Sequence, residues 1–281
     1  MKINKDSLKA KANNLANELG VSQNIIYDRF FYDAFLSRLV ISRYKDKFVL
    51  KGGLYLSSLL GINNRSTMDL DFHLNSIAME KDNIVSIIKE ISTLDLDDNI
   101  SFTIINSEDI RQEDIYGGFR VIILGKLDNV RHQFSIDVAT GDPIIPSDRD
   151  YEYKCLVTGE VLPLKVYSLE SVISEKLETV LFKGIANSRS KDFYDLYILR
   201  KTQIKNVNAD ALKQAFEKTC EYRSFHITKE DALSRLEILK DNSFVDARWI
   251  SYCKNAKYVS YLPFEEVIES IKEWVEVATQ L

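Results

Sequence analysis

The run of residues 51–72 constrains the fold of this chain more than any other part of the sequence. It reads as a strand, a glycine turn at Gly52 and Gly53, a short helix, and a second strand that carries Asp69 and Asp71. Residues two apart on a strand point to the same face, so the two carboxylates should share one face of a sheet. The side chains between and beside them are apolar and should face the core: Met68, Leu70 and Phe72.

Paired carboxylates at this spacing are a usual way to hold Mg²⁺, or Mn²⁺, which prefer oxygen ligands and share them with substrate phosphates. The two glycines let backbone N–H groups approach the triphosphate of an NTP at the start of a helix. Arg65, Ser66 and Thr67 lie just upstream and are candidate nucleotide contacts. The alternative is a surface strand with two exposed acids, which we disfavour because same-face carboxylates repel each other. The run therefore predicts a site for transferring a nucleotide.

A third carboxylate on a neighbouring strand is a usual part of two-metal phosphoryl chemistry. The best candidate is Asp137, which lies among apolar residues of a predicted strand over 130–140. A buried lone carboxylate is costly unless it is paired or bound to a metal. Asp142 is the weaker alternative, because aspartate is common in turns such as residues 141–143 for conformational reasons alone.

Hydrophobic periodicity predicts an α+β first half with a mixed sheet. Two helices are expected within residues 6–45, with Asp6 and Ser22 as N-caps and Gly20 as the stop between them. A further helix is expected over 79–93. The expected strands are 48–50, 68–74, 100–106, 117–127 and 130–140, the last two joined by the short turn Asp128-Asn129. Residues 141–163 contain three of the four prolines and read as a long connection.

From Ser168 onward the pattern is almost wholly helical. The expected helices are 169–183, 191–201, 209–222, 229–241, 246–257 and 264–280, with Ser168, Asn208 and Thr228 as N-caps and Gly184 as a C-cap. We therefore expect two domains. Residues 1–164 should form the domain with the sheet, and residues 165–281 a helical domain that completes the cleft.

The start of the helical half carries a second group of charged candidates. Lys176 lies one position from an apolar stripe of its helix, and Lys191, Asp192 and Asp195 begin the next helix. We expect the lysines to contact phosphate, and the aspartates, which share a helix face, to orient a lysine or an arginine. The alternative for the aspartates is a solvated helix start that the helix dipole favours.

The net charge of −5 does not favour a protein coated for nucleic acid. The stretch from Ser168 to Lys205 nevertheless has a local surplus of cations that could guide an RNA backbone. No apolar run approaches the roughly 20 residues needed to span a bilayer, so no membrane partner is expected. Three widely spaced cysteines, in no metal-ligand pattern, lead us to expect reduced thiols and a cytoplasmic protein.

In combination, these motifs resemble the AbiEii/MenT family of nucleotidyltransferase toxins. The matching runs are KGG at 51–53, RSTMDLDF at 65–72, SEK at 174–176 and KDFYDL at 191–196. The resemblance covers most of the chain. The length of the chain and the order of its domains are most like those of AbiEii.

The resemblance implies a DNA-polymerase-β-like nucleotidyltransferase domain followed by a helical domain. It implies a toxin of a type IV toxin–antitoxin, abortive-infection system in phage defence. Such a toxin would transfer nucleotides from an NTP such as GTP to RNA, with a tRNA 3′ end as acceptor. It also implies an operon-encoded, DNA-binding antitoxin that need not touch the toxin. Asp69 and Asp71 match the metal-binding pair, Lys176 matches the lysine of the helix after the sheet, and residues 191–195 match the KDxxD stretch.

One departure from polymerase-β-like enzymes stands out, because they usually have Gly-Ser where this chain has Gly52-Gly53. Ser57, Ser66 and Thr67 are candidates to replace the missing serine, or backbone N–H groups alone serve. Two other readings stay open: a nucleotidyltransferase that modifies a protein hydroxyl or a small molecule, and a module that binds an NTP without transferring it.

Overall fold

The computed structural model describes residues 3–65, 67, 69–110, 117–256, 258–259 and 262–279. The chain divides into two compact units, one of Met1–Gly141 with Arg149–Val166 and one of Asp142–Asp148 with Tyr167–Leu281. The sequence put the division two residues earlier, between 164 and 165, and put residues 142–148 in the first domain rather than the second.

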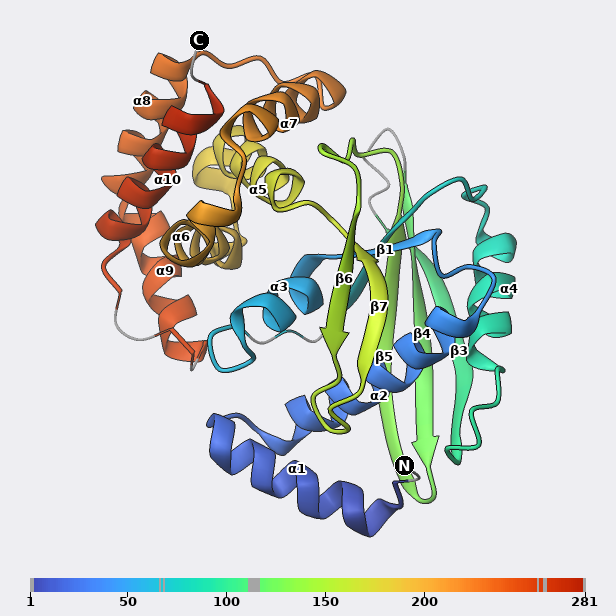
Figure 1. Cartoon of the computed structure of the whole chain (residues 1–281). Helices are drawn as coiled ribbons and strands as arrows, with labels where there is room; N and C mark the ends of the chain where they lie inside the picture. The colour runs from blue at the N-terminus through green and yellow to red at the C-terminus, as the bar shows by residue number, and fades with distance from the viewer. Residues whose placement is uncertain are drawn as a thin grey trace. The chain divides into compact units, whose positions relative to one another are not determined.

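The first unit is built on a sheet whose seven strands follow the order β3-β4-β5-β2-β1-β7-β6 (Figure 1). The strands are β1 Phe48–Lys51, β2 Asp69–Leu74, β3 Ile100–Ile110, β4 Gly118–Leu127, β5 Val130–Ala139, β6 Arg149–Lys154 and β7 Val161–Val166. β2 pairs in parallel with β5, and β1 in parallel with β7, whereas the other neighbours are antiparallel. The α+β class with a mixed sheet is therefore confirmed.

The helices of this unit are α1 Lys5–Leu19, α2 Gln23–Ile41, α3 Gly52–Leu60 and α4 Lys81–Ser92. α2 packs on one face of the sheet, where the ring of Tyr32 meets that of Phe134 with centroids 5.2 Å apart. α1 packs on α2, and α4 packs against α2 and β3. α3, which begins with Gly52 and Gly53, packs against β1 and against β2, the strand that carries Asp69 and Asp71.

The second unit is helical, as Figure 1 shows in yellow to red. Its helices are α5 Leu169–Lys183, α6 Ser190–Gln203, α7 Ala209–Tyr222, α8 Lys229–Lys240, α9 Ser243–Asn255 and α10 Phe264–Ala278, with short 3₁₀ turns at Gly184–Ala186 and Ile204–Asn206. α10 contacts α5, α6, α7 and α8 and so forms the centre of the unit. Its Trp274 is fully buried and donates from Nε1 to the carbonyl of Leu196 at 2.9 Å.

Most predicted elements are confirmed within a few residues, and so are most of their caps. The side chains of Ser168, Asn208 and Thr228 each accept a backbone N–H of the first helical turn, and Gly20 and Gly184 end their helices with positive φ. The N-cap of α1 is Asn4 rather than Asp6, and α9 begins at Ser243, three residues before the expected start.

The prediction of a long connection over 141–163 is wrong, because β6 and the first half of β7 lie there. Pro163 suggested a loop, since proline cannot donate a ladder hydrogen bond. In the structure β7 pairs with β1 only at Lys165 and Val166, so Pro163 lies outside that ladder. The proline therefore costs the β1–β7 pair no hydrogen bond.

Candidate active site

A row of charged residues crosses the sheet of the first unit at one level. The strand registers place Glu108 opposite Arg120, Arg120 opposite Asp137, Asp137 opposite Asp71, and Asp71 opposite Lys51. Residues directly opposite each other on neighbouring strands share a face, so these five side chains line one face of the sheet. Asp71 and Asp137 form the only like-charge step of the row.

Asp69 and Asp71 lie on this face, as their spacing predicted. Both are half-buried, whereas the alternate residues Leu70 and Phe72 are 0% and 1% exposed in the core. Phe134, whose ring contacts Tyr32 of α2, and Asp137 lie three positions apart on β5, so their side chains point to opposite faces of the sheet. The acidic face is therefore the one that α2 does not cover. Met68, the third residue expected in the core, lies outside the described residues.

The two glycines bring the start of α3 against the acidic strand. Gly52 has φ of +66°, and a Cβ atom there would stand 2.1 Å from Oδ2 of Asp71. A Cβ atom on Gly53 would stand 2.2 Å from Oγ1 of Thr67. The first N–H groups of α3, which receive no side-chain cap, therefore begin beside Asp71. Uncapped N–H groups at a helix N-terminus favour an anion such as phosphate.

Asp137 is held by an arginine that the sequence analysis did not single out. Arg120 donates from Nε and Nη2 to the two carboxylate oxygens of Asp137, each at 2.7 Å. This hydrogen bond with Asp137 raises the pKa of Arg120, as do the charges of Asp69 and Glu108 to a smaller degree. The turn Asp128-Asn129 could have revealed the pair, because a two-residue hairpin turn sets residue 120 opposite residue 137.

The donor set fits a divalent ion in part. Asp69 and Asp71 offer carboxylate oxygens on one face, the donors that Mg²⁺ and Mn²⁺ prefer. Among the side chains that the structure describes, no group of three or more His, Cys, Asp or Glu is arranged to hold a metal ion. Both oxygens of the third candidate, Asp137, are instead bonded to Arg120.

The remaining candidates of the first unit come from α3 itself or from the segment between α3 and β2. Arg65 is buried, and its backbone N–H donates to the carbonyl of Gly61 at 3.0 Å. Thr67 accepts the N–H of Asp69 at 3.3 Å, beside Gly53. Ser66 lies outside the described residues. Ser57 is buried, and its Oγ has no hydrogen-bond partner in the described part of the chain.

In the second unit the structure brings Lys176, Asp192 and Asp195 together. Nζ of Lys176, on α5, lies 2.7 Å from Asp192 and 2.8 Å from Asp195, both on α6. Asp195 is fully buried and Asp192 nearly so. Burial alone would lower the pKa of Lys176, but the two carboxylates outweigh it and raise the pKa, so the ammonium stays charged. The solvated helix start considered for the aspartates is therefore wrong, because both are buried against a lysine.

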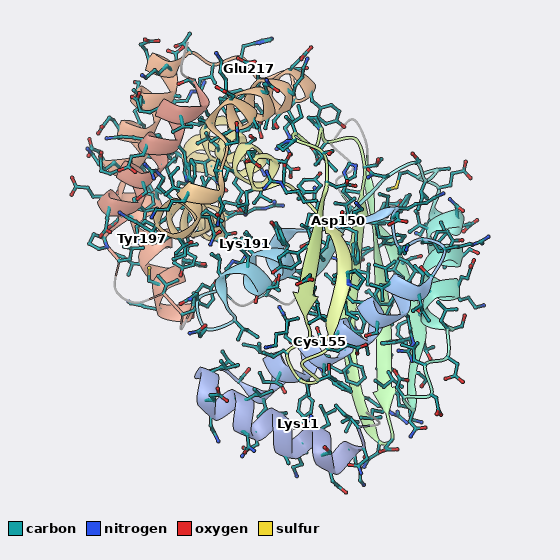
Figure 2. The ribbon with its side chains drawn as sticks, viewed as in Figure 1. Lys11, Asp150, Cys155, Lys191, Tyr197 and Glu217 are labelled. Atoms are coloured by element: carbon teal, nitrogen blue, oxygen red, sulfur yellow. The ribbon has the colours of Figure 1, made fainter. Side chains whose placement is uncertain are left out.

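Lys191 occupies the same helix start with an exposed side chain (Figure 2). Among the four candidates of this unit, it is the one whose side chain is exposed. The site residues of the unit thus separate into a buried charged triad and an exposed cation.

Arg223, the residue that follows α7, pairs with carboxylates of α5 and of residue 142. It bonds Glu178 and Asp142, with Nη2 3.0 Å from the Asp142 carboxylate, and lies 3.8 Å from Glu175. Asp142, the alternative third carboxylate, is therefore paired with an arginine of its own unit. Burial alone would lower the pKa of Arg223, but the surrounding carboxylates raise it.

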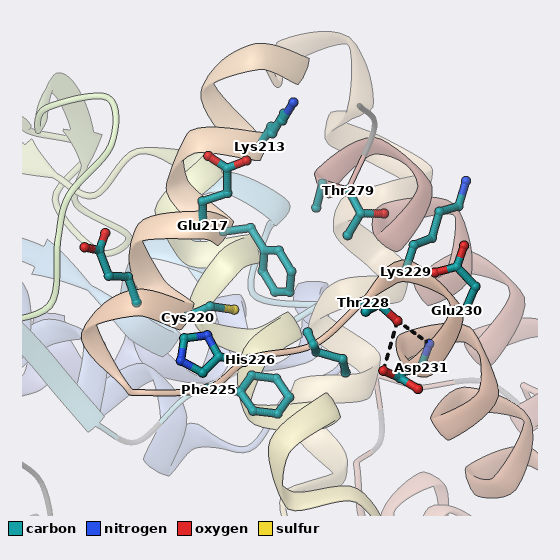
Figure 3. A pocket seen from close by; sticks show the side chains of 14 residues that line it. Lys213, Glu217, Cys220, Phe225, His226, Thr228, Lys229, Glu230, Asp231 and Thr279 are labelled. Carbon is teal, nitrogen blue, oxygen red and sulfur yellow. Dashed lines mark hydrogen bonds between the residues drawn. The ribbon is translucent and has the colours of Figure 1, made fainter.

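A cavity of about 700 Å³ opens in the second unit between α7, the start of α8 and the end of α10 (Figure 3). Its lining includes Phe216, Cys220, Phe225 and His226, and none of the predicted site residues. Burial raises the pKa of Cys220 to about 12, which keeps the thiol protonated and a poor nucleophile.

Comparison with known proteins assigns the chain to a family. The family model of the nucleotidyl transferase AbiEii toxin, type IV toxin–antitoxin system, matches residues 34–270. No curated protein matches the chain by sequence. The match includes both carboxylates of β2, the α3 glycines and the Lys176 triad, and it spans most of the chain.

Two crystal structures of Helicobacter pylori proteins match the chain at low similarity. One, provisionally named a nucleotidyltransferase, shares 15% sequence identity with this chain at a TM-score of 0.44. The match covers 89% of this chain and 94% of the Helicobacter pylori chain. The other, JHP933, is 17% identical with a TM-score of 0.43, covering 86% of this chain and 89% of its own. At these scores the assignment rests on the family match.

The class that these observations define is the nucleotidyltransferase. The chain belongs to the AbiEii family of nucleotidyl transferase toxins of type IV toxin–antitoxin systems, as its motifs predicted. Membership implies a nucleotide as substrate and an antitoxin as partner. No helix in the described ranges is both long and apolar enough to cross a membrane.

Proposed function

We propose that this toxin transfers nucleotides from an NTP, GTP among the candidates, to RNA in the cytoplasm, with a tRNA 3′ end as acceptor. The observation that carries the proposal is the pair Asp69 and Asp71 on one sheet face, against the uncapped start of α3. This arrangement offers carboxylates for Mg²⁺ or Mn²⁺ and N–H groups for a triphosphate at one place.

In the proposed reaction an acceptor hydroxyl gives its proton to water, and its oxygen bonds to the α-phosphorus as the bond to pyrophosphate breaks. The divalent ion, when bound, neutralises charge on the triphosphate and the leaving pyrophosphate. Asp69 and Asp71 hold that ion, and the N–H groups of Gly52 and Gly53 cradle phosphate. Arg65, Ser66 and Thr67 flank the nucleotide.

The second unit supplies the cations. Lys176 is a phosphate contact that Asp192 and Asp195 orient, and Lys191 contacts phosphate from an exposed position. The units correspond in this proposal to a DNA-polymerase-β-like domain and a helical domain.

The distribution of charge from Ser168 to Lys205 supports RNA as the acceptor. All its carboxylates are buried or half-buried, whereas five of its cations are exposed: Lys183, Arg189, Lys191, Lys201 and Lys205. The surface of this stretch is therefore basic, although the whole chain carries a net charge of −5. A basic surface gives sequence-independent affinity for a phosphate backbone.

The test is incubation of the protein with total cellular RNA, Mg²⁺ and each labelled NTP in turn. We expect label in RNA of tRNA size, lost in Asp69→Asn and Asp71→Asn. The control is Asp150→Asn, because Asp150 is an exposed acid of the same unit (Figure 2). Label on a protein or a small molecule instead would select the second acceptor class, and no label at all would favour a module that only binds nucleotide.

We further propose that the partner is an operon-encoded, DNA-binding antitoxin that need not contact the toxin, in a system that defends against phage. Expression of the toxin alone should then arrest growth, and Asp69→Ala should relieve the arrest at equal expression. Continued arrest by Asp69→Ala would contradict a catalytic toxin.

A further inference from the structure

The charged row of the first unit, defined by Glu108, Arg120, Asp137, Asp71 and Lys51, is nearly balanced along its length. Directly opposed like charges on neighbouring strands are destabilising, so the Asp137–Asp71 step requires a cation. A site with three clustered carboxylates would meet that need with divalent ions. In this chain the strand registers already set a cation on each side of the step, Lys51 opposite Asp71 and Arg120 opposite Asp137, and the ion pair of Asp137 with Arg120 is bidentate.

Arg120 is built to hold Asp137 firmly. Its fork bonds both oxygens of one carboxylate at 2.7 Å, the bidentate geometry that makes such pairs strong. Its third nitrogen, Nη1, lies 3.9 Å from Glu108 on the other neighbouring strand. The guanidinium therefore sits between two acids, and its carboxylate partner is only 14% exposed.

We propose that Arg120 is the resident counter-ion of Asp137 and takes the place of a second divalent ion. The protein then binds one divalent ion, at Asp69 and Asp71, while Asp137 acts as a positioning residue through Arg120. This inference rests on the proposed function in one respect, namely that Asp69 and Asp71 hold a divalent ion.

The test counts bound ions directly, without NTP or RNA. Mn²⁺ is titrated into the whole chain and free Mn²⁺ is followed by electron paramagnetic resonance. We expect one Mn²⁺ per wild-type chain. Arg120→Gln frees Asp137 beside Asp71 and Asp69, so this variant should bind a second ion or bind the first about tenfold more tightly, a change of about 1.4 kcal/mol.

Two controls separate the counter-ion role from a loss of charge. Lys126→Gln removes an exposed cation from the same strand, β4, and should bind one ion as the wild type does. Arg120→Lys keeps the charge and should also bind one ion. A thermal melt covers the risk of misfolding, since Mn²⁺ should raise the melting temperature of Arg120→Gln more than that of the wild type.

Asp137→Asn decides whether Asp137 is itself a ligand. We expect it to keep the single ion with affinity within about threefold of wild type, because Asp69 and Asp71 remain. Two bound ions in the wild type, loss of the ion in Asp137→Asn, or unchanged binding in Arg120→Gln would each overturn the inference. A wild type that binds no Mn²⁺ would overturn it together with the metal role of Asp69 and Asp71, whereas the other outcomes leave nucleotide transfer standing.

Discussion

Asp71 lies directly against Gly52, so closely that a Cβ atom on residue 52 would stand 2.1 Å from the Asp71 carboxylate. Glycine is required there for two reasons, the close approach and a φ of +66°. The contact joins the start of α3 to the acidic strand. Because residue 52 has no side chain, the uncapped start of α3 can lie directly beside the carboxylate of Asp71.

Replacing this glycine should therefore damage the site more than backbone strain alone can explain. Gly52→Ala should displace Asp71, abolish nucleotide transfer and lower the free energy of unfolding by more than the left-handed conformation costs. Gly20→Ala is the control, because Gly20 has φ of +65° with no atom within 4 Å of the added Cβ. That control should lose about 1 kcal/mol and keep full activity. Equal losses in urea denaturation and equal activity would show that the contact with Asp71 does not matter.

Substitutions of Lys176 and Lys191 should differ in their effect on stability, because Lys176 is buried between two aspartates and Lys191 is exposed. Lys176→Met leaves Asp192 and Asp195 buried without their cation, which should cost about 3–5 kcal/mol of stability. Lys191→Met removes only an exposed charge, so the unfolding midpoint should not move, although nucleotide transfer should fall. Denaturation and transfer assays on both variants check this. A Lys176→Met protein as stable as wild type would refute the structural role of the triad.

Arg223 should be essential to the stability of the second unit. Arg223→Met leaves Glu178 and Asp142 without their partner in a largely buried position, and we expect a loss of about 3 kcal/mol. Arg223→Lys should recover only part of it, because a lysine cannot bond two carboxylates with a planar fork. Lys218→Met, on the preceding helix α7, breaks an exposed pair with Glu221 and should leave the thermal midpoint unchanged.

Asp33 should make stability depend on pH. It is buried on α2, accepts hydrogen bonds from Tyr153 and from the N–H of Leu156, and burial raises its pKa from 3.8 to about 6. The folded chain thus binds this proton more tightly than the unfolded chain. Its contribution to stability is full below about pH 4 and is lost as pH rises through 6.

Asp33→Asn removes this titration while keeping the size of the side chain. The free energy of unfolding of the wild type, relative to that of Asp33→Asn, should fall by about 2 kcal/mol between pH 4 and 7. Urea denaturation across that range measures it. Parallel curves for the two proteins would contradict a raised pKa.

The sequence by itself determined the elements whose signals are local. Alternation placed Asp69 and Asp71 on one face of β2 with Leu70 and Phe72 in the core, and side-chain caps placed α5, α7 and α8 to the residue at their starts. These features follow from neighbours within a few positions along the chain, where periodicity and capping chemistry operate. The family followed from such local runs taken together.

The tertiary structure alone decided which charges meet. Arg223 joins residues 142 and 178, and Lys176 joins two aspartates of the next helix, through packing that no spacing rule encodes. Arg120 and Asp137 are an intermediate case, since the hairpin turn sets their register but not the bidentate bond. The parallel pairing of β2 with β5 brought Asp71 beside Asp137, and the pairing of β7 with β1 turned an expected loop into a strand. Parallel pairing joins segments far apart along the chain, so burial and the partner strand decide it rather than local sequence.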